Sequence, residues 1–308
     1  APGNFLPWRF GSVNCGVRDW GEAMNDAVGR MLARYERRNT EDSVRALREI
    51  LQEIALLGLW RSKFFDKAAF YGGTSLRLLY GLDRFSEDLD FSLLTPTPAF
   101  ELSRYGDALQ AEMAAFGFDV RFEARTERAV QSAFLKADTL QQLMVIETDR
   151  AAIADLRGQV LKIKLEVDTA PPAGFSTEVR YLLQPVAFPV RVYVLADLFA
   201  GKMHAVLCRK WKDRVKGRDW YDLVWYVTHH PRLHLGHLEK RMRQSGHWQG
   251  EAQLNAEAFF RLLAHAIESL NVEQARKEVE VFVRDPGGLA IWSRDFFHDI
   301  VRRIEVQI

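Results

Sequence analysis

The sequence lacks the features that define several common classes of protein. Cys15 and Cys208 are its only cysteines in 308 residues, so it has no disulfide framework, and a reduced cytoplasm is the expected location. No apolar run reaches the ~18–20 residues of a membrane span. The first residues show no basic segment followed by an apolar one, so we expect no signal peptide. P-loop, G-x-S-x-G and C-x-x-C patterns are absent, which argues against Walker ATPases, hydrolases and thiol redox enzymes.

The sequence also lacks a strong charge of either sign. Lys and Arg number 42 against 41 Asp and Glu, so any contact with nucleic acid must come from a local basic patch. Hydrophobic residues make up 48% of the chain, enough for a sizeable core. The length is compatible with one large domain or two modest ones.

Hydrophobic spacing predicts a long helix that is capped by Thr40 and ends near Gly58. We expect a buried strand and a glycine turn at 68–73, a short helix at 75–82 and a strand at 87–94. A helix near 101–116 and strands at 118–125, 143–148, 160–169 and 190–195 follow, with a proline-rich loop over 171–189. The remaining segments are helical in pattern: 195–212, 217–227, 255–270, 273–284 and 295–303.

This order predicts a mixed α/β (α+β) fold, with a mixed sheet and flanking helices followed by an α-helical second half. The pattern turns helical from Leu195 onward, which places the boundary near Val194. We therefore expect residues 1–194 to hold an N-terminal arm, a helix and the sheet domain, and residues 195–308 to form a mostly α-helical C-terminal domain.

Two carboxylates stand out in the strand at 87–94. Residues i and i+2 of a strand share a face, so Asp88 and Asp90 lie together, on either side of the apolar Leu89. Close carboxylates repel each other unless a cation lies between them. Mg²⁺ suits such a pair, because it takes one or two carboxylates together with phosphate oxygens and water.

The glycines of the same unit complement this pair. Gly72 and Gly73 lack Cβ atoms and begin a helix, where backbone N–H groups and the dipole attract phosphate. Taken singly, a Gly-Gly turn is often structural, paired acids are often solvated, and Thr74 and Ser75 are often helix caps. Their combination in one strand–turn–helix–turn–strand unit favours metal-assisted nucleotide chemistry.

The stretch FYGGTSLRLLYGLDRFSEDLDFSL, residues 70–93, resembles the signature of the AbiEii/AbiGii-type (MenT-like) nucleotidyltransferase toxins, which belong to the DNA polymerase β-like superfamily. The resemblance implies the polymerase-β-like fold, with Asp88 and Asp90 holding the metal. It also implies that the triphosphate is bound by the following residues: Gly72, Gly73, and Thr74 or Ser75. Ser86 and Arg84 match motif positions too, and we place Ser86 with the nucleotide-binding group.

Such a site usually has a third carboxylate on a neighbouring strand. In VLKIKLEVDT, residues 160–169, the polar side chains Lys162, Lys164, Glu166 and Asp168 all face one way. A half-exposed strand with paired charges would show the same pattern. The resemblance favours Glu166 as the third metal ligand, with Asp168 as the alternative.

The second half of the chain carries the cations. Lys202 lies on an otherwise apolar helix, where it either extends to solvent or reaches a ligand. Six basic residues follow within ten positions, a solvated face or a phosphate-contacting patch: Arg209, Lys210, Lys212, Arg214, Lys216 and Arg218. By resemblance, Lys202 contacts nucleotide phosphates, and Asp219 and Asp222 match the motif acids, one of which is required for activity.

These expectations lead to one functional hypothesis. The chain is a Mg²⁺-dependent toxin that transfers NMP from an NTP to RNA, by resemblance the 3′ acceptor end of tRNA, which would block translation, and it has a cognate antitoxin. The proposed catalytic residues are as follows: Asp88, Asp90, Lys202, Asp219 and Asp222. Two alternatives remain, transfer to a protein or small molecule, and a non-catalytic module that binds RNA or a partner.

Overall fold

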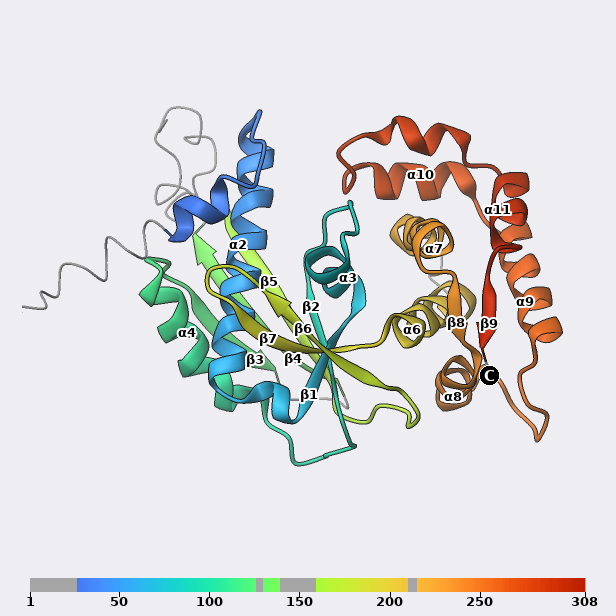
Figure 1. The fold of residues 1–308 in the computed structure, drawn as a ribbon, viewed down its shortest axis with the longest axis horizontal. Coiled ribbons are helices and arrows are strands. Elements are labelled where there is room, and N and C mark those ends of the chain that lie inside the picture. Colours follow the sequence, from blue (N-terminus) through green and yellow to red (C-terminus); the bar gives the residue numbers. More distant parts are fainter. Residues whose placement is uncertain (1–26, 126–129, 139–158, 210–214, 308) are drawn as a thin grey trace, which may run out of the picture.

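The computed structural model describes residues 27–125, 130–138, 159–209 and 215–307. A sheet with its helices forms one half, and a group of helices forms the other (Figure 1). The short helix α3 (Gly72–Tyr80) lies between the two halves and contacts both the sheet and α6 (Leu195–Cys208). The segment that carries the glycines is therefore central to the molecule.

The sheet is mixed and has seven strands in the order β3-β4-β5-β2-β1-β7-β6. Its strands have these bounds: β1 Ala68–Tyr71, β2 Leu89–Leu93, β3 Arg121–Arg125, β4 Val130–Asp138, β5 Val160–Asp168, β6 Thr177–Leu182 and β7 Phe188–Tyr193. β2 pairs antiparallel with β1 and parallel with β5. The parallel pairing brings a strand from more than 60 residues further along the chain to the side of the carboxylate strand.

One long helix, α2 (Thr40–Arg61), packs on the sheet and against α4 (Gly106–Ala115). Its cap is Asn39, whose side chain accepts a hydrogen bond from Asp42 N, so the prediction of Thr40 as the cap was wrong by one residue. The predicted end at Gly58 was also wrong. A Cβ on Gly58 would lie 3.2 Å from Glu112 Cβ, so this glycine permits close helix contact and does not end the helix.

The second half of the chain is mainly helical and contains one short parallel strand pair, β8 (Arg232–His234) with β9 (Glu305–Gln307). Its helices have these bounds: α6 Leu195–Cys208, α7 Gly217–His229, α8 Leu235–Gln244, α9 Ala256–Glu268, α10 Val272–Glu280 and α11 Arg294–Val301. Short 3₁₀ turns occur at Phe64–Asp66, Leu102–Tyr105 and Pro286–Ile291. No helix in the described ranges is both long and apolar enough to span a membrane.

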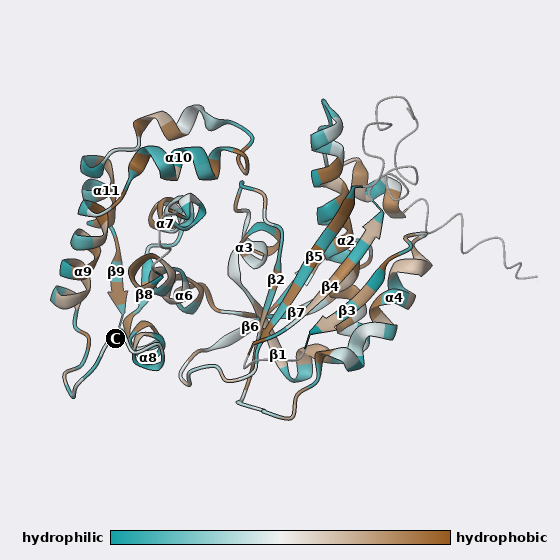
Figure 2. Cartoon of the chain, turned by 180° about the vertical axis from the view of Figure 1, so that it is seen from behind, coloured by the Kyte–Doolittle hydropathy of each residue, from teal (hydrophilic) through white to brown (hydrophobic). Residues whose placement is uncertain are grey.

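The core follows the alternation of the strands. Leu89, Phe91 and Leu93 of β2 are buried, as the sequence predicts. Hydrophobic and hydrophilic residues alternate along the strands when the molecule is seen from behind (Figure 2). These apolar side chains anchor the strand in the core, and Asp90 points to the opposite face of the sheet.

The predicted mixed sheet with flanking helices and a helical second half is confirmed. The sequence analysis missed β4, β6 within the supposed loop at 171–189, α8, and the short strands β8 and β9. The predicted strand at 143–148 lies outside the described residues. A division of the chain near Val194 stays a prediction, although the last sheet strand ends at Tyr193 and α6 begins at Leu195.

Candidate active site

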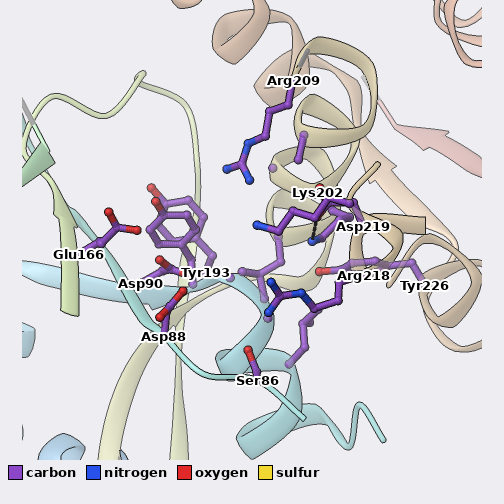
Figure 3. A pocket seen from close by; sticks show the side chains of 18 of the residues that line it. Ser86, Asp88, Asp90, Glu166, Tyr193, Lys202, Arg209, Arg218, Asp219 and Tyr226 are labelled. Carbon is purple, nitrogen blue, oxygen red and sulfur yellow. Dashed lines mark hydrogen bonds and ion pairs between the residues drawn. The ribbon is translucent and has the colours of Figure 1, made fainter. Parts of the chain in front are cut away.

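Three carboxylates lie at one place on the sheet. Asp90 in β2 is paired in register with Glu166 in β5, and Asp88 immediately precedes β2. In Figure 3 these three side chains lie together on one side of a cavity. Asp168 is paired with Ser92, one step further along the same face, and its carboxylate accepts a hydrogen bond from Ala170 N at 3.0 Å. The strand register therefore favours Glu166 over Asp168 as the third acid.

The electrostatics of this acidic wall are unfavourable without a cation. Burial raises the pKa of Asp90 to about 7, and the negative charges of Asp88 and Glu166 add to the effect. The pKa of Asp88 is raised too, by burial first and then by Glu87. Within the described part of the chain neither aspartate forms an ion pair, whereas Glu166 Oε1 lies 2.6 Å from Lys164 Nζ.

The two glycines make room for side chains of the site. Gly72 begins α3 with φ +83°, and a Cβ there would lie 2.5 Å from Asp90 Oδ2. At Gly73 a Cβ would lie 2.6 Å from Arg84 Nη2. The residue before α3, Tyr71, makes no side-chain capping bond, so this helix start offers backbone N–H groups beside the carboxylates.

The hydroxyl groups of this motif point inward. Thr74 and Ser75 are buried. The Thr74 hydroxyl bonds to the carbonyl oxygen of Asp88 and lies 2.8 Å from the Ser86 hydroxyl, while the Ser75 hydroxyl donates to Gly72 O at 2.8 Å. Ser86 lines the cavity, and the other two do not. In this geometry Thr74 ties the helix to the segment that carries Asp88, whereas Ser75 bonds within the first turn of the same helix. The contact of either hydroxyl with nucleotide stays a prediction.

The opposite wall consists of residues from α6 and α7. Lys202 Nζ lies 2.5 Å from Asp219 Oδ1 and 2.7 Å from Asp222 Oδ2. Asp222 also accepts two hydrogen bonds from Arg84, each of 2.6 Å. Burial alone would raise the pKa values of both aspartates, but Arg84 and Lys202 hold the pKa of Asp222 below its usual value, and Lys202 and Lys216 do the same for Asp219.

The predicted basic run is described in part. Arg209, Lys216 and Arg218 line the cavity. Lys210, Lys212 and Arg214 lie outside the described residues. Arg218 is also held by Glu278, with Nε 3.4 Å from Oε1, and its guanidinium lies over the ring of Phe282. The basic patch therefore reaches the cavity at its two described ends.

The two walls face each other across a cavity of about 350 Å³ (Figure 3). Asp88, Asp90 and Glu166 lie on one side, and Lys202, Arg209 and Arg218 on the other. Asp219 lines the cavity, whereas Asp222 is buried behind it. Other lining residues were not identified from the sequence: Tyr193, Asp197, Tyr226 and Arg241. Arg241 belongs to the unpredicted α8, and no sequence pattern marks the rest.

The acidic wall fits a hard divalent cation. All its donors are carboxylate oxygens, the ligands that such ions prefer, and the two aspartates have no cationic partner among the described residues. The oxygens of Asp88, Asp90 and Glu166 are not all within 4.8 Å of one another, so they form no closed ligand cage. Such spacing suits ions that share their coordination with phosphate and water.

A family model and several solved structures are similar to this chain. The family model described as the nucleotidyl transferase AbiEii toxin of type IV toxin–antitoxin systems matches residues 54–299. No curated protein matches the chain. Among solved structures, JHP933 from Helicobacter pylori shares 17% identity with a TM-score of 0.48, over 83% of this chain and 91% of that one. Another, described as a nucleotidyltransferase from H. pylori, shares 17% identity with a TM-score of 0.45, over 82% and 90%.

Proposed function

Because the chain belongs to the family of AbiEii nucleotidyl transferase toxins of type IV toxin–antitoxin systems, we propose that it transfers NMP from an NTP to the 3′ end of tRNA. The predicted resemblance to this family and the prediction of a nucleotidyltransferase are confirmed. The family implies an NTP substrate, a divalent metal ion and an antitoxin partner. The tRNA acceptor, Mg²⁺ as the metal and a site of action in the cytoplasm are our proposals.

One observation carries the proposal. Asp90 and Glu166 are paired in register on the sheet, and Lys202 lies across the same cavity. A nucleoside triphosphate needs carboxylates for its metal and cations for its phosphates, and this cavity presents the two on opposite walls. Mg²⁺ held by Asp88, Asp90 and Glu166 would polarise the α-phosphate and favour deprotonation of the acceptor hydroxyl.

The other residues bind and orient the substrates. The backbone N–H groups of Gly72 and Gly73, at the start of α3, donate hydrogen bonds to phosphate oxygens beside Asp90. Lys202 and Arg209 neutralise the β- and γ-phosphates while the acceptor oxygen attacks the α-phosphorus and pyrophosphate leaves. Asp219 holds the Lys202 ammonium at the cavity, at 2.5 Å, and Asp222 holds Arg84, which also lines the cavity.

In this proposal the two predicted domains supply different groups to the site. Residues 1–194 supply the metal ligands and the glycine turn, and residues 195–308 supply the phosphate-binding cations. We propose that the basic run from Arg209 to Arg218 continues from the cavity toward the RNA backbone. Attachment of a nucleotide to the tRNA 3′ end would prevent aminoacylation and so arrest translation, and the antitoxin would counteract this effect.

The experiment that tests the proposal follows the label of an α-³²P NTP. Each of the four NTPs is incubated with the protein, Mg²⁺ and either purified tRNA or total protein. We expect label in tRNA and none when the 3′ terminal ribose has been oxidised with periodate, because the acceptor hydroxyl is then lost. Label only in protein, or label in oxidised tRNA, would contradict the proposed acceptor.

Two variants with the same chemistry serve as a matched pair. Asp90→Asn removes a carboxylate of the cavity and should abolish both transfer and growth arrest. Asp168→Asn removes a carboxylate from the same sheet face outside the cavity and should preserve both. Equal loss in the two variants would contradict the assignment of the site.

A further inference from the structure

A second group of metal-compatible side chains lies apart from the nucleotide cavity. His204 and Cys208 belong to α6, and His247 follows α8. One possible ligand atom of each lies within 4.8 Å of those of the other two. In the ranges that the structure describes, no other group of three His, Cys, Asp or Glu meets this distance. None of the three lines the cavity.

The two ligands on α6 share one face of the helix. His204 and Cys208 are four residues apart, so their side chains lie one above the other on the same side. That side contacts α8, and Cys208 is buried there. The thiol is therefore directed toward the element that brings the third ligand.

The position of His247 is fixed by the end of α8. Gly246 adopts φ +75°, its N–H bonds to Arg243 O at 3.0 Å, and the His247 N–H bonds to Met242 O at 2.8 Å. This pair of bonds is the Schellman arrangement, which terminates helices in a defined geometry. The imidazole of His247 is thus presented by a fixed backbone although its side chain is exposed.

Both imidazoles already converge on one oxygen atom. Ser245 Oγ lies 2.8 Å from His204 Nε2 and 2.9 Å from His247 Nδ1. The two rings are nearly perpendicular, with an interplanar angle of 89° and centroids 6.3 Å apart. The two imidazole nitrogens are therefore directed toward the same small region, beside the Ser245 hydroxyl.

We propose that His204, Cys208 and His247 bind a divalent transition metal ion of the zinc class. Two imidazole nitrogens and one thiolate are donors that Zn²⁺ prefers, with water or the Ser245 hydroxyl as the fourth ligand. Zinc bonds of ~2.0–2.3 Å place ligand atoms about 3.5 Å apart, and the three ligand atoms here already lie within 4.8 Å of one another. This metal site is separate from the proposed nucleotidyl transfer site, whose metal ligands are all carboxylate oxygens.

Metal binding here fixes the end of α6 to the end of α8. Arg209, the residue after Cys208, lines the nucleotide cavity, so the ion holds the helix turn from which this cation extends. The positive charges of Arg241 and Arg209 lie near His204 and repel a metal ion bound there. The thiolate of Cys208 is the only negative ligand, so its loss should have the largest effect on binding.

The test is a titration of the metal-free protein with Zn²⁺ against a chromogenic chelator, and with Co²⁺ followed by near-ultraviolet thiolate-to-metal absorption. We expect one tight equivalent and a cobalt–thiolate band. Cys208→Ser should remove the band and weaken Zn²⁺ binding by about 100-fold, and His247→Ala should weaken it by about 10-fold or more. The same titration in the Asp90→Asn protein should be unchanged, because the acidic wall contributes no ligand.

Matched variants separate this site from general effects. Cys15→Ser removes the other cysteine, and His298→Ala removes a histidine of α11 whose ring is bonded to Glu268 of α9. Both should bind Zn²⁺ as the wild type does. Zn²⁺ should raise the melting temperature of the wild type more than that of His247→Ala, while the melting temperatures of the two metal-free proteins agree. Absence of an equivalent, or a band that survives Cys208→Ser, would overturn the proposal.

Discussion

Two pairs of aspartates lie in opposite walls of the same cavity, and their pKa values shift in opposite directions. Burial and neighbouring carboxylates raise the pKa values of Asp88 and Asp90. Asp219 and Asp222 are more deeply buried, yet their pKa values are lowered. The difference lies in their neighbours, since Lys202 and Arg84 are in direct contact with the second pair only.

This contrast shows how burial should be interpreted at such a site. The negative charge of a buried carboxylate can be neutralised by a cationic side chain of the protein. A buried carboxylate without such a partner favours the binding of a cation from solution. The sheet wall therefore indicates a metal site, and the helix wall an internal ion network that positions Lys202. Substitutions in either wall therefore test this contrast.

Removal of a sheet carboxylate should have the largest effect on catalysis. We expect Glu166→Gln to lower kcat by about 10³-fold, because the site loses a charged metal ligand beside Asp90. Asp168→Asn, on the same strand face, should stay within ~3-fold. The check is the initial rate of NMP transfer at saturating Mg²⁺. Reversed effects would make Asp168 the third ligand.

Removal of an internal carboxylate should affect folding more than chemistry. Asp222→Ala leaves the guanidinium of Arg84, only 3% exposed, without its partner and should cost about 3–5 kcal/mol in the free energy of unfolding. Urea denaturation measures this. Asp219→Ala preserves the Arg84–Asp222 pair, so it should cost less than half as much while lowering kcat/KM. Similar losses of stability in both variants would contradict the distinction.

The glycine beside Asp90 should be sensitive for two separable reasons. Gly72→Ala combines an unfavourable positive φ with a Cβ 2.5 Å from Asp90 Oδ2. Gly81→Ala has almost the same φ, +81°, but no atom within 4 Å, so it isolates the backbone cost of about 1–2 kcal/mol. We expect activity to fall ~10-fold or more in Gly72→Ala alone, measured as kcat after both proteins are shown to be folded.

The contribution of Asp90 to the stability of the metal-free protein should decrease as the pH rises, whereas the lowered pKa values of His204 and His237 act in the opposite direction. The pKa of Asp90 is about 7 in the fold against 3.8 for the unperturbed group, so its stabilising contribution is complete below pH ~4 and is lost between pH 4 and 7. Glu53, with a pKa of about 7, acts in the same direction. The difference in melting temperature between wild type and Asp90→Asn isolates Asp90 and should change sign when Mg²⁺ is added.

The smallest effect is expected at the edge of the cavity. Arg209→Ala should reduce the slope of log affinity for tRNA against log salt by about 1, since one phosphate contact is lost. Arg261→Ala, an exposed arginine of α9, serves as the control and should leave the slope unchanged. Filter binding at several salt concentrations gives both slopes. An unchanged slope in Arg209→Ala would exclude it from the RNA contact.

The local part of this site could be predicted from the sequence. Gly72, Asp88 and Asp90 lie within one short unit, and a strand period of two suffices to place both acids on one face. The choice between Glu166 and Asp168 could not be made from alternation alone, because both share a face. It depends on the register of β2 with β5, which only the folded sheet defines.

Other properties depend on contacts that no local pattern encodes. A Thr or Ser in a glycine motif can direct its hydroxyl outward to a ligand or inward, and Thr74 bonds inward to Asp88 O. Arg84 finds its partner Asp222 at a distance of 138 residues in sequence. The strand β6 was missed because prolines surround it, yet an edge strand tolerates such neighbours.

The loop between α3 and β2 has a consequence for the order in which the site matures during synthesis. Phe85 N donates to Phe282 O at 2.7 Å, and Arg84 is bound by Asp222. A ribosome makes Asp88 and Asp90 first and supplies these two supports only much later. We therefore expect a nascent chain to be inactive in nucleotidyl transfer until the residues up to Phe282 have left the ribosome.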